Sequence, residues 1–381
     1  MDFELTEDQK LLHSTIRDFA RKEIVPVASR IDKENEFPAE TVKKMAGLGL
    51  FGLIIPEKYG GSGKGVLDLC LAVEELACAS AAVDNYLRVS LSLAIVPIIE
   101  FGTEEQKQKY LPVHAAGEKL ACFALTEAGA GSDPSSMETT ATRKGDGYVL
   151  NGTKCFISIG EHSDIVVVFA TVDKSLGGRG ITAFIVEKGT PGLKVGRREE
   201  KMGLHGFISS ELNFEDCFIP AGNRLGEEGQ GFKIALEALD ASRITVGAES
   251  VGISRAAYEA ALAYAKERKQ FGEPIANFQA IQWMLTDMAT QIDAARLLTW
   301  RAAKLLDEGK PCVKEAAMAK LFASEACGSI TSKALQIHGG YGYTTDFPME
   351  RYFRDAKITE IYEGTSEIMR LTIARSILRE G

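Results

Sequence analysis

Ile165-Val166-Val167-Val168-Phe169-Ala170-Thr171-Val172 is the stretch that decides the fold class of this protein. A continuous run of β-branched and aromatic residues is typical of a buried strand. A second run of this kind covers residues 180–186, and turn signals stand at Gly145-Asp146-Gly147 and Asn151-Gly152. Because no helical pattern separates these short strands, residues 119–227 are predicted to form a small antiparallel barrel or sandwich.

Helical patterns lie on both sides of this β region. Thr6 precedes polar residues and then apolar residues at helical spacing, which is typical of a capped amphipathic helix. Between Phe278 and Leu305, apolar side chains recur every three or four residues, and Gly309 and Pro311 end this stripe. Such a stripe is typical of a helix in a four-helix bundle.

The length and composition of the chain allow several domains. It has 381 residues, of which 45% are hydrophobic, so it can bury a large core. We therefore predict an α+β protein with three parts. An N-terminal α-helical domain covers residues 1–118, a middle antiparallel β-barrel domain covers residues 119–227, and a C-terminal four-helix bundle covers residues 228–381.

The charge balance and the start of the chain argue against two classes of partner. Lysine and arginine number 44 against 53 acidic residues, a net charge of −9, and no basic run is present, so no nucleic acid is expected as partner. The N-terminus carries acids where a signal peptide needs bases, and no stretch approaches the roughly 18 apolar residues of a membrane span. A cytoplasmic location is expected, or the mitochondrial matrix if a targeting peptide has been removed.

The cysteines and histidines do not form a metal motif. The seven cysteines are odd in number and no two have C-x-x-C spacing, so reduced, mostly buried thiols are expected. The five histidines are scattered, so no metal site is expected. The G-x-S-x-G motif of serine hydrolases is absent, and no G-x-G-x-x-G stands between a strand and a helix.

Three motifs carry residues suited to chemistry. The first is Ala124-Leu125-Thr126-Glu127-Ala128-Gly129-Ala130-Gly131-Ser132-Asp133, a strand running into a loop of small residues that exposes backbone amides. The second is Gln336-Ile337-His338-Gly339-Gly340-Tyr341-Gly342-Tyr343, followed by Arg354-Asp355, and the third is Ile361-Tyr362-Glu363-Gly364-Thr365-Ser366. Taken alone, the first also suits an ordinary tight turn, and the third also suits the N-cap of a final helix.

Together the three motifs resemble the acyl-CoA dehydrogenase family, in order and spacing over the whole chain. They match its T-E-x-x-x-G-S-D, Q-x-x-G-G-x-G-Y…R-D and Y-E-G-T signatures, and the family's helical, β-barrel and helical domains agree with the three parts above. Two departures are visible: Ala128 stands where proline is frequent, and Phe156 stands where tryptophan is frequent. Neither departure removes a reacting group.

The resemblance implies FAD as cofactor, bound between the β domain and the bundle. Thr126 and Ser158 match positions that contact the flavin ring, and Phe156 can still cover a ring face. Arg268 matches an arginine that reaches the FAD pyrophosphate of a neighbouring subunit, for which a guanidinium fork is well suited. Further FAD contacts are implied at Phe271, Gln279, Gln336, Gly339, Gly340 and Thr365.

The resemblance also implies the reaction. A carboxylate removes the α-proton of an acyl-CoA thioester while the β-hydride passes to flavin N5, and Glu363 matches that base. Some members place the base just before the arginine of a D-x-x-R helix, but Ser242 stands there and cannot serve. Asp240 and Arg243 match this pair, near the pantetheine arm, and Ser132 matches a position near the CoA chain. Asp240 and Arg243 also suit an i,i+3 ion pair on a helix surface.

The acyl group is the least determined feature. Residues 296–301 and 358–361 resemble the short-chain, butyryl-type branch. Asp84 and Arg88 fall on the helix that lines the far end of the acyl cavity in relatives, and they equally suit an i,i+4 ion pair on the helix surface. An inward Arg88 would favour a dicarboxylic acyl chain, and an inward Asp84 would favour a cyclic or unsaturated ring. We therefore expect a short or compact acyl group, with a cyclic or carboxylated one as the main alternative.

The resemblance finally implies partners and leaves alternatives. Family members act in fatty-acid β-oxidation, pass electrons to electron-transfer flavoprotein and are usually homotetramers. The same residues would serve an enoyl-CoA reductase, which runs the reaction in reverse. An alternative of another class is a non-catalytic relative that acts as a binding or assembly protein, against which the intact Glu363 and flavin motifs argue.

Overall fold

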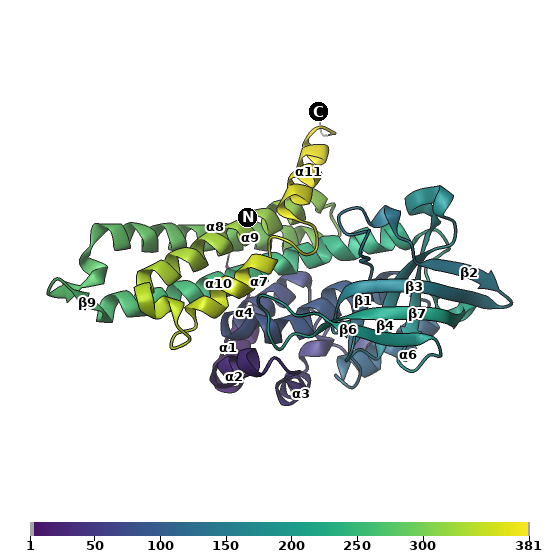
Figure 1. Ribbon diagram of the computed structural model, residues 1–381, viewed down its shortest axis with the longest axis horizontal. Coiled ribbons are helices and arrows are strands. Elements are labelled where there is room, and N and C mark those ends of the chain that lie inside the picture. Colours follow the sequence, from purple (N-terminus) through teal and green to yellow (C-terminus); the bar gives the residue numbers. More distant parts are fainter. Residues whose placement is uncertain (1–3, 380–381) are drawn as a thin grey trace.

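Two helical parts flank a sheet in the computed structural model of the protein (Figure 1). The structure describes residues 4–379. The predicted α+β class with a helical first part, a β middle part and a helical last part is confirmed. The limits of the domains at residues 118 and 227 stay a prediction.

The N-terminal part packs around one buried helix. The expected cap at Thr6 is confirmed, because its hydroxyl accepts from the backbone N–H of Gln9 at 3.2 Å and the Gln9 side chain accepts from the N–H of Thr6 at 3.1 Å. The fourth helix is apolar on nearly all sides and is buried along most of its length. The helices are α1 (Glu7–Phe19), α2 (Val25–Glu34), α3 (Ala39–Gly47), α4 (Val66–Val89), α5 (Val96–Phe101) and α6 (Glu104–Ala115).

The middle part is a sheet with the strand order β6-β7-β3-β2-β4-β5-β8, and β1 pairs with β4. The strands are β1 (Ala121–Ala124), β2 (Thr140–Lys144), β3 (Gly147–Ser158), β4 (Ile165–Thr171), β5 (Ile181–Glu187), β6 (Leu193–Arg198), β7 (Ser209–Pro220) and β8 (Arg224–Leu225). The expectation of a wholly antiparallel barrel needs correction, because β4 runs parallel to both β1 and β2. These pairs join strands distant in sequence, so no local turn signal announces them.

One of the two predicted turns is wrong. Gly145 and Asp146 do form a hairpin turn, with Lys144 paired to Gly147. Gly152 instead lies inside β3, where the register to β7 shifts between Leu150 and Gly152, as in a β-bulge. The backbone φ of Gly152 is +150°, and a Cβ added there would lie 2.4 Å from the Thr139 hydroxyl oxygen. A side chain would not fit at this position, so the glycine belongs to the bulge.

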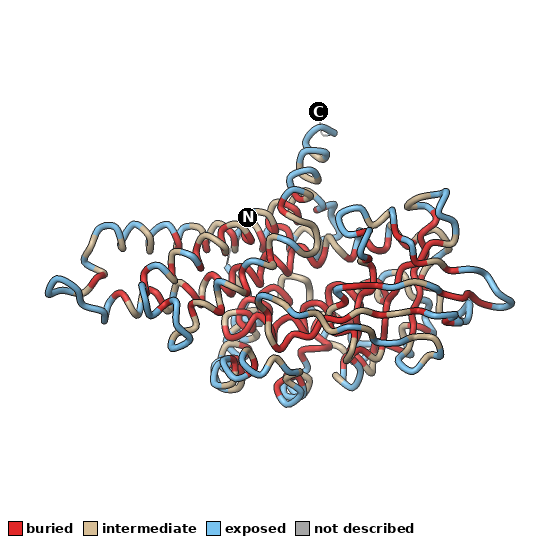
Figure 2. The backbone as a smooth tube through the Cα atoms, in the orientation of Figure 1, coloured by how far each residue is buried: buried red, intermediate tan, exposed pale blue. Residues whose placement is uncertain are grey.

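The C-terminal part is built on long helices, with α4 packed against α7 and α8. The bundle tip that carries β9 lies at the far left of Figure 1, opposite the end of the molecule with β2, and α11 projects from the body. Figure 2 shows the buried backbone concentrated in the sheet and where α4 meets α7, whereas the bundle tip and α11 are largely exposed. The elements are α7 (Gly231–Glu267), β9 (Lys269–Gln270), β10 (Glu273–Pro274), α8 (Gln279–Asp307), α9 (Val313–His338), α10 (Met349–Ile358) and α11 (Ser366–Ile377).

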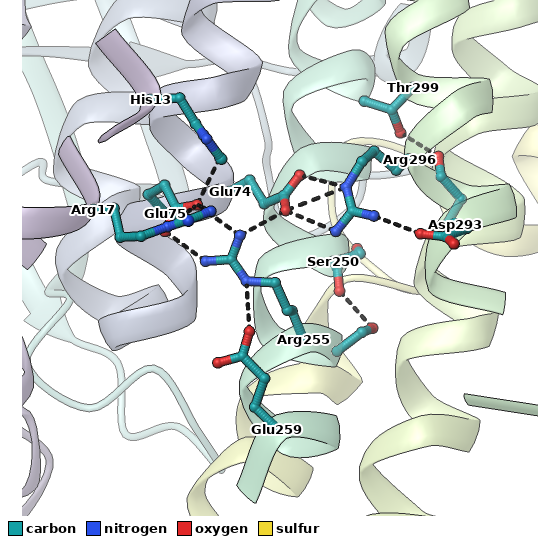
Figure 3. Close-up of polar contacts among 12 residues, drawn as sticks. His13, Arg17, Glu74, Glu75, Ser250, Arg255, Glu259, Asp293, Arg296 and Thr299 are labelled. Carbon is teal, nitrogen blue, oxygen red and sulfur yellow. Dashed lines mark hydrogen bonds and ion pairs between the residues drawn. The ribbon is translucent and has the colours of Figure 1, made fainter. Parts of the chain in front are cut away.

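A buried network of charges joins the first part to the last (Figure 3). Glu74 and Glu75 on α4 both accept hydrogen bonds from Arg255 on α7, at 2.8 and 2.5 Å. Arg296 on α8 donates to Glu74 at 2.9 Å, and Arg17 on α1 donates to Glu75 at 2.9 Å. Four helices are therefore cross-linked through two adjacent carboxylates, which no periodicity in the sequence indicates.

Candidate active site

Glu363 lies in the short segment between α10 and α11, in a backbone conformation that costs energy. Its φ is +55°, in the left-handed region that a non-glycine residue occupies at a cost of about 1–3 kcal/mol. The segment is held from two helices: Arg243 Nε on α7 donates to the Glu363 carbonyl at 3.2 Å, and Lys320 Nζ on α9 donates to the Gly364 carbonyl at 2.8 Å. These contacts fix the direction in which the Glu363 side chain leaves the backbone.

Thr365 ends this segment and begins α11. Its hydroxyl accepts from the backbone N–H of Ile368 at 3.4 Å, so the N-cap suggested by the sequence is present. A capping hydroxyl uses its oxygen as acceptor and keeps its own proton available. The cap and the expected contact to a cofactor are therefore compatible.

The Glu363 carboxylate is nearly buried, with 6% of the side chain exposed, and its two oxygens differ. Oε1 accepts a hydrogen bond from Arg88 Nη1 at 2.7 Å. Oε2 is buried and has no hydrogen-bond partner among the described residues. One oxygen of the candidate base is thus held, and the other has an unused capacity to accept a proton or a hydrogen bond.

Arg88 and Asp84 point inward, so the alternative of an ion pair on a helix surface is wrong. Both side chains are 0% exposed, because α4 is packed among α1, α2, α7 and α8. Asp84 makes no hydrogen bond with either oxygen. Burial, and then the charge of Glu249, raise the pKa of Asp84 well above its usual value.

Arg243 links the expected D-x-x-R pair to the base. Its Nη1 donates to Asp240 Oδ1 at 2.7 Å, so the i,i+3 ion pair exists, but Arg243 is only 6% exposed and also holds the Glu363 carbonyl. Ser242, at the alternative base position, lies 3.4 Å from Arg88 Nη1 through its hydroxyl. That position therefore contacts the arginine that holds the candidate base, and it carries no carboxylate to compete with Glu363.

The first motif forms a loop that a buried ion pair braces. The Glu127 carboxylate accepts from the backbone N–H groups of Glu138 at 2.6 Å and Thr139 at 3.0 Å, and from Lys154 Nζ at 2.7 Å. Burial lowers the pKa of Lys154 to about 8, against the opposing charge of Glu127. Sequence reasoning missed this lysine, because its polar neighbours Asn151 and Thr153 in β3 suit an exposed side chain equally well.

The expected flavin-ring residues lie together at the end of β3. The Thr126 carbonyl accepts from the N–H of Cys155 at 3.0 Å, which ties the first motif to β3. Phe156 has a φ of +58° and is 62% exposed, and Ser158 is half-buried. Two hydroxyls beside an outward aromatic ring fit a planar heteroaromatic ligand. Ser132 is exposed in the loop after β1.

The other expected FAD residues gather at the bundle tip, around a cavity of about 520 Å³. Arg268, Gly339 and Gly340 line it, and Arg268 lies over the Tyr341 ring at 5.9 Å. A Cβ added at either glycine would meet nothing within 4 Å, so the backbone is open to a ligand, and a guanidinium beside it fits a pyrophosphate. The remaining expected contacts, Phe271, Gln279 and Gln336, are exposed.

The two groups of expected FAD residues are not brought together within one chain. Arg268 directly precedes β9 at the far left of Figure 1, whereas β3 lies in the sheet at the other side of the molecule. The residues at the end of β3 suit the flavin half of FAD, and those at the bundle tip suit the pyrophosphate. One FAD molecule could contact both groups if a second chain supplied one of them.

Three potential metal ligands meet elsewhere, in the charge network of Figure 3. His13 Nε2 lies 2.6 Å from Glu75 Oε1, and Glu74 is close to both. Arg17, Arg255 and Arg296 already donate to these carboxylates, and their positive charges oppose a metal ion. Although burial alone would raise it, hydrogen bonds from His13, Arg255 and Arg17 hold the pKa of Glu75 well below its usual value. The absence of a metal stays a prediction.

Two further expectations concern the whole chain. All seven cysteines are free, as predicted, and all but Cys78 are buried. Across residues 4–379, every helix is too short or too polar to cross a lipid bilayer.

Comparison with known proteins gives matches along the whole chain. Family models described as the N-terminal, middle and C-terminal domains of acyl-CoA dehydrogenase match residues 6–118, 122–217 and 229–378. Acryloyl-CoA reductase (NADH) of Anaerotignum propionicum is 52% identical over 381 residues, which cover 100% of this chain and 96% of that protein.

Two solved structures superpose closely. A chain from a study of the electron transferring flavoprotein of Acidaminococcus fermentans has a TM-score of 0.98 at 51% identity, and covers 100% of both chains. Butyryl-CoA dehydrogenase from Megasphaera elsdenii has a TM-score of 0.98 at 46% identity, again over 100% of both chains.

Proposed function

This chain belongs to the acyl-CoA dehydrogenase family, FAD enzymes that act on acyl-CoA, and we propose that it dehydrogenates a short or compact acyl-CoA to the 2-enoyl-CoA with Glu363 as base. One observation carries the proposal. Glu363 is a nearly buried carboxylate with one oxygen held by Arg88 and the other without a partner. A general base needs this combination of fixed position and a free lone pair.

The residues around Glu363 account for the proton transfer. The α-proton of a thioester is weakly acidic, so the base must be placed close to it and shielded from water. Glu363 Oε2 takes the α-proton, and the N–H of Glu363 stabilises enolate character at the carbonyl, as an oxyanion hole does. Arg243 and Lys320 hold the backbone of this segment while the proton moves. FAD, when bound, accepts the β-hydride.

The acyl group is proposed to be short and uncharged. The butyryl and acryloyl groups in the names of the two similar proteins are both short. Arg88 already contacts the carboxylates of Glu249 and Glu363, at 3.2 and 2.7 Å, so a carboxylate on the acyl chain would bring a third negative charge to one buried cation. The dicarboxylic alternative requires a buried Arg88 that lacks a partner. Arg88 instead pairs with two carboxylates, so the alternative loses its support.

A cyclic acyl group remains the alternative that a specific observation favours. Asp84 is a buried acid whose two oxygens have no partner, and it lies one helical turn from Arg88 on α4. An unpartnered buried acid near the arginine that holds the base can hydrogen-bond or exchange a proton with an unsaturated ring. The same residues would also serve enoyl-CoA reduction, and the reductase from Anaerotignum supports that direction as a second candidate.

The assembly and the redox partner complete the proposal. We propose that FAD is shared between two chains of a homotetramer, because Arg268 at the bundle tip and Ser158 in β3 are distant within one chain. Electron-transfer flavoprotein is the proposed electron acceptor, and the similarity to a chain studied with such a protein supports it.

The test is anaerobic bleaching of the bound flavin by propionyl-, butyryl-, glutaryl- and cyclohexanecarboxyl-CoA. We expect rapid bleaching by the short neutral thioesters, and none by glutaryl-CoA. Bleaching by cyclohexanecarboxyl-CoA alone would show that the acyl group is cyclic instead. A protein that stays colourless after addition of FAD, or that no thioester bleaches, would instead be a non-catalytic relative.

A further inference from the structure

Arg88 on α4 contacts the carboxylate of Glu363. The inference drawn from this contact rests on the proposed role of Glu363 as the base. Arg88 is 0% exposed, and its guanidinium is held by hydrogen bonds at both Nη atoms. Nη1 donates to Glu363 Oε1 at 2.7 Å and Nη2 donates to Asn85 Oδ1 at 2.7 Å. Nε lies 3.2 Å from Glu249 Oε2 as an ion pair without a hydrogen bond, and the two hydrogen bonds of Nη1 and Nη2 orient the planar fork.

Glu249 on α7 locks this arrangement from the other side. Its Oε1 accepts from Asn85 Nδ2 at 2.5 Å, and its Oε2 accepts from the hydroxyl of Tyr362, the residue directly before Glu363. The Arg88 guanidinium also lies over the Tyr362 ring, 5.0 Å from its centre. Glu363 is therefore held at two points: Arg88 contacts its carboxylate, and Glu249 contacts the preceding residue, Tyr362.

We infer that Arg88 is a positioning residue of the reaction: it holds Glu363 Oε1 so that Oε2 faces the substrate as an ionised proton acceptor. Burying two carboxylates and one arginine is costly unless the geometry is good, and here Nη1 and Nη2 of the arginine each donate a hydrogen bond at 2.7 Å while Nε contacts Glu249 by charge alone. Without Arg88 the Glu363 carboxylate can rotate, and a displacement of about 1 Å from the reacting geometry costs on the order of 10²-fold in rate.

Charged and titratable groups face Glu363 from every element packed against it. Arg88 comes from α4, Arg243 and Glu249 come from α7, and Lys320 comes from α9. Arg88 is the cation that contacts the carboxylate itself, whereas Arg243 and Lys320 contact backbone carbonyls. Loss of Arg88 should therefore disfavour the charged form of the base more than loss of any other cation here.

The experiment compares flavin reduction by butyryl-CoA, over a range of pH, in wild type, Arg88→Lys, the double variant Arg88→Gln/Glu249→Gln, and Ser250→Ala. The control residue Ser250 is buried next to Glu249 in the sequence, and its hydroxyl donates to the Val246 carbonyl of its own helix at 2.8 Å. FAD content and melting temperature are measured in each. The lysine variant keeps the buried positive charge, and the double variant removes the internal ion pair as a unit.

We expect the rate to fall about 10- to 100-fold in the double variant and less in the lysine variant. The acid limb of the pH profile should move to higher pH in the double variant and part of the way in the lysine variant. Ser250→Ala should match wild type.

A double variant that holds FAD and keeps the wild-type rate and pH profile overturns the inference. If that variant does not fold, the lysine variant decides, and wild-type behaviour there overturns the inference. If wild type is bleached by no thioester, or Glu363→Gln is as fast as wild type, the proposed function fails and this inference falls with it.

Discussion

Arg255→Gln removes the guanidinium that both buried carboxylates of α4 share. Arg255 is 13% exposed and donates to Glu74 at 2.8 Å and to Glu75 at 2.5 Å, and those two side chains are 4% and 2% exposed. Removing one partner of a buried ion pair costs about 3–5 kcal/mol. Because Glu74 keeps Arg296 and Glu75 keeps Arg17, we expect the lower end, about 3 kcal/mol of unfolding free energy.

The assay is urea unfolding of the FAD-loaded protein at neutral pH, with flavin reduction measured in parallel. Lys10→Gln is the matched control, because its ion pair with Glu7 is exposed and should contribute nothing measurable. Arg255→Gln should lose stability and keep its rate of flavin reduction. A loss below about 0.5 kcal/mol, the range of ordinary surface substitutions, would refute the idea that this network holds the first helices to the bundle.

The same network predicts a pH dependence. The pKa of Glu75 is lower in the folded protein than its ordinary value of 4.5, through hydrogen bonds from His13, Arg255 and Arg17 that outweigh burial. A depressed carboxylate pKa contributes stability above the unfolded pKa, and that stability is lost as the pH falls. The difference between wild type and Arg255→Gln should therefore shrink as the pH falls below 4.5. A difference that stays constant would assign the loss to packing instead.

Two other substitutions test separate parts of the site. Arg268→Ala should weaken FAD binding about tenfold or more, because it removes a charge-assisted contact to pyrophosphate, and equilibrium dialysis measures it; unchanged affinity would make Arg268 a solvated helix-end residue. Asp84→Asn should leave the protein as stable or more stable near pH 8, because the pKa of Asp84 is raised by burial and ionisation there opposes folding. Urea unfolding checks the second, and a clear loss of stability would mean that the ionised acid has a partner.

The sequence predicted the elements whose signals are local. The β-branched run at 165–172 became β4, the cap at Thr6 is present, and the apolar stripe from Phe278 became α8. It did not predict the parallel pairing of β4 with β1, because no turn connects them. Gly152 was misread because glycine serves turns and bulges alike, and only the partner strand distinguishes them.

The site divides in the same way. Motifs continuous in sequence located Glu363, Thr365 and the loop after β1, since their spacing is local. The partners of the base could not be found in this way, because Arg88 lies 275 residues before Glu363 and Glu249 meets it only where α7 packs on α4. The available signal was Arg88 on an apolar helix, which suited both a surface ion pair and an inward side chain. The burial of Arg88 in the structure decides between the two.

The rate of anaerobic flavin reduction by Glu363→Gln tests the central claim most directly. The substitution keeps the size of the side chain and an oxygen that can accept from Arg88, and it removes the carboxylate that takes the proton. The account predicts that the variant retains FAD and its melting temperature, while the rate falls about 10²- to 10⁴-fold at saturating butyryl-CoA. A folded, FAD-loaded variant that keeps more than about a tenth of the wild-type rate would contradict Glu363 as the base.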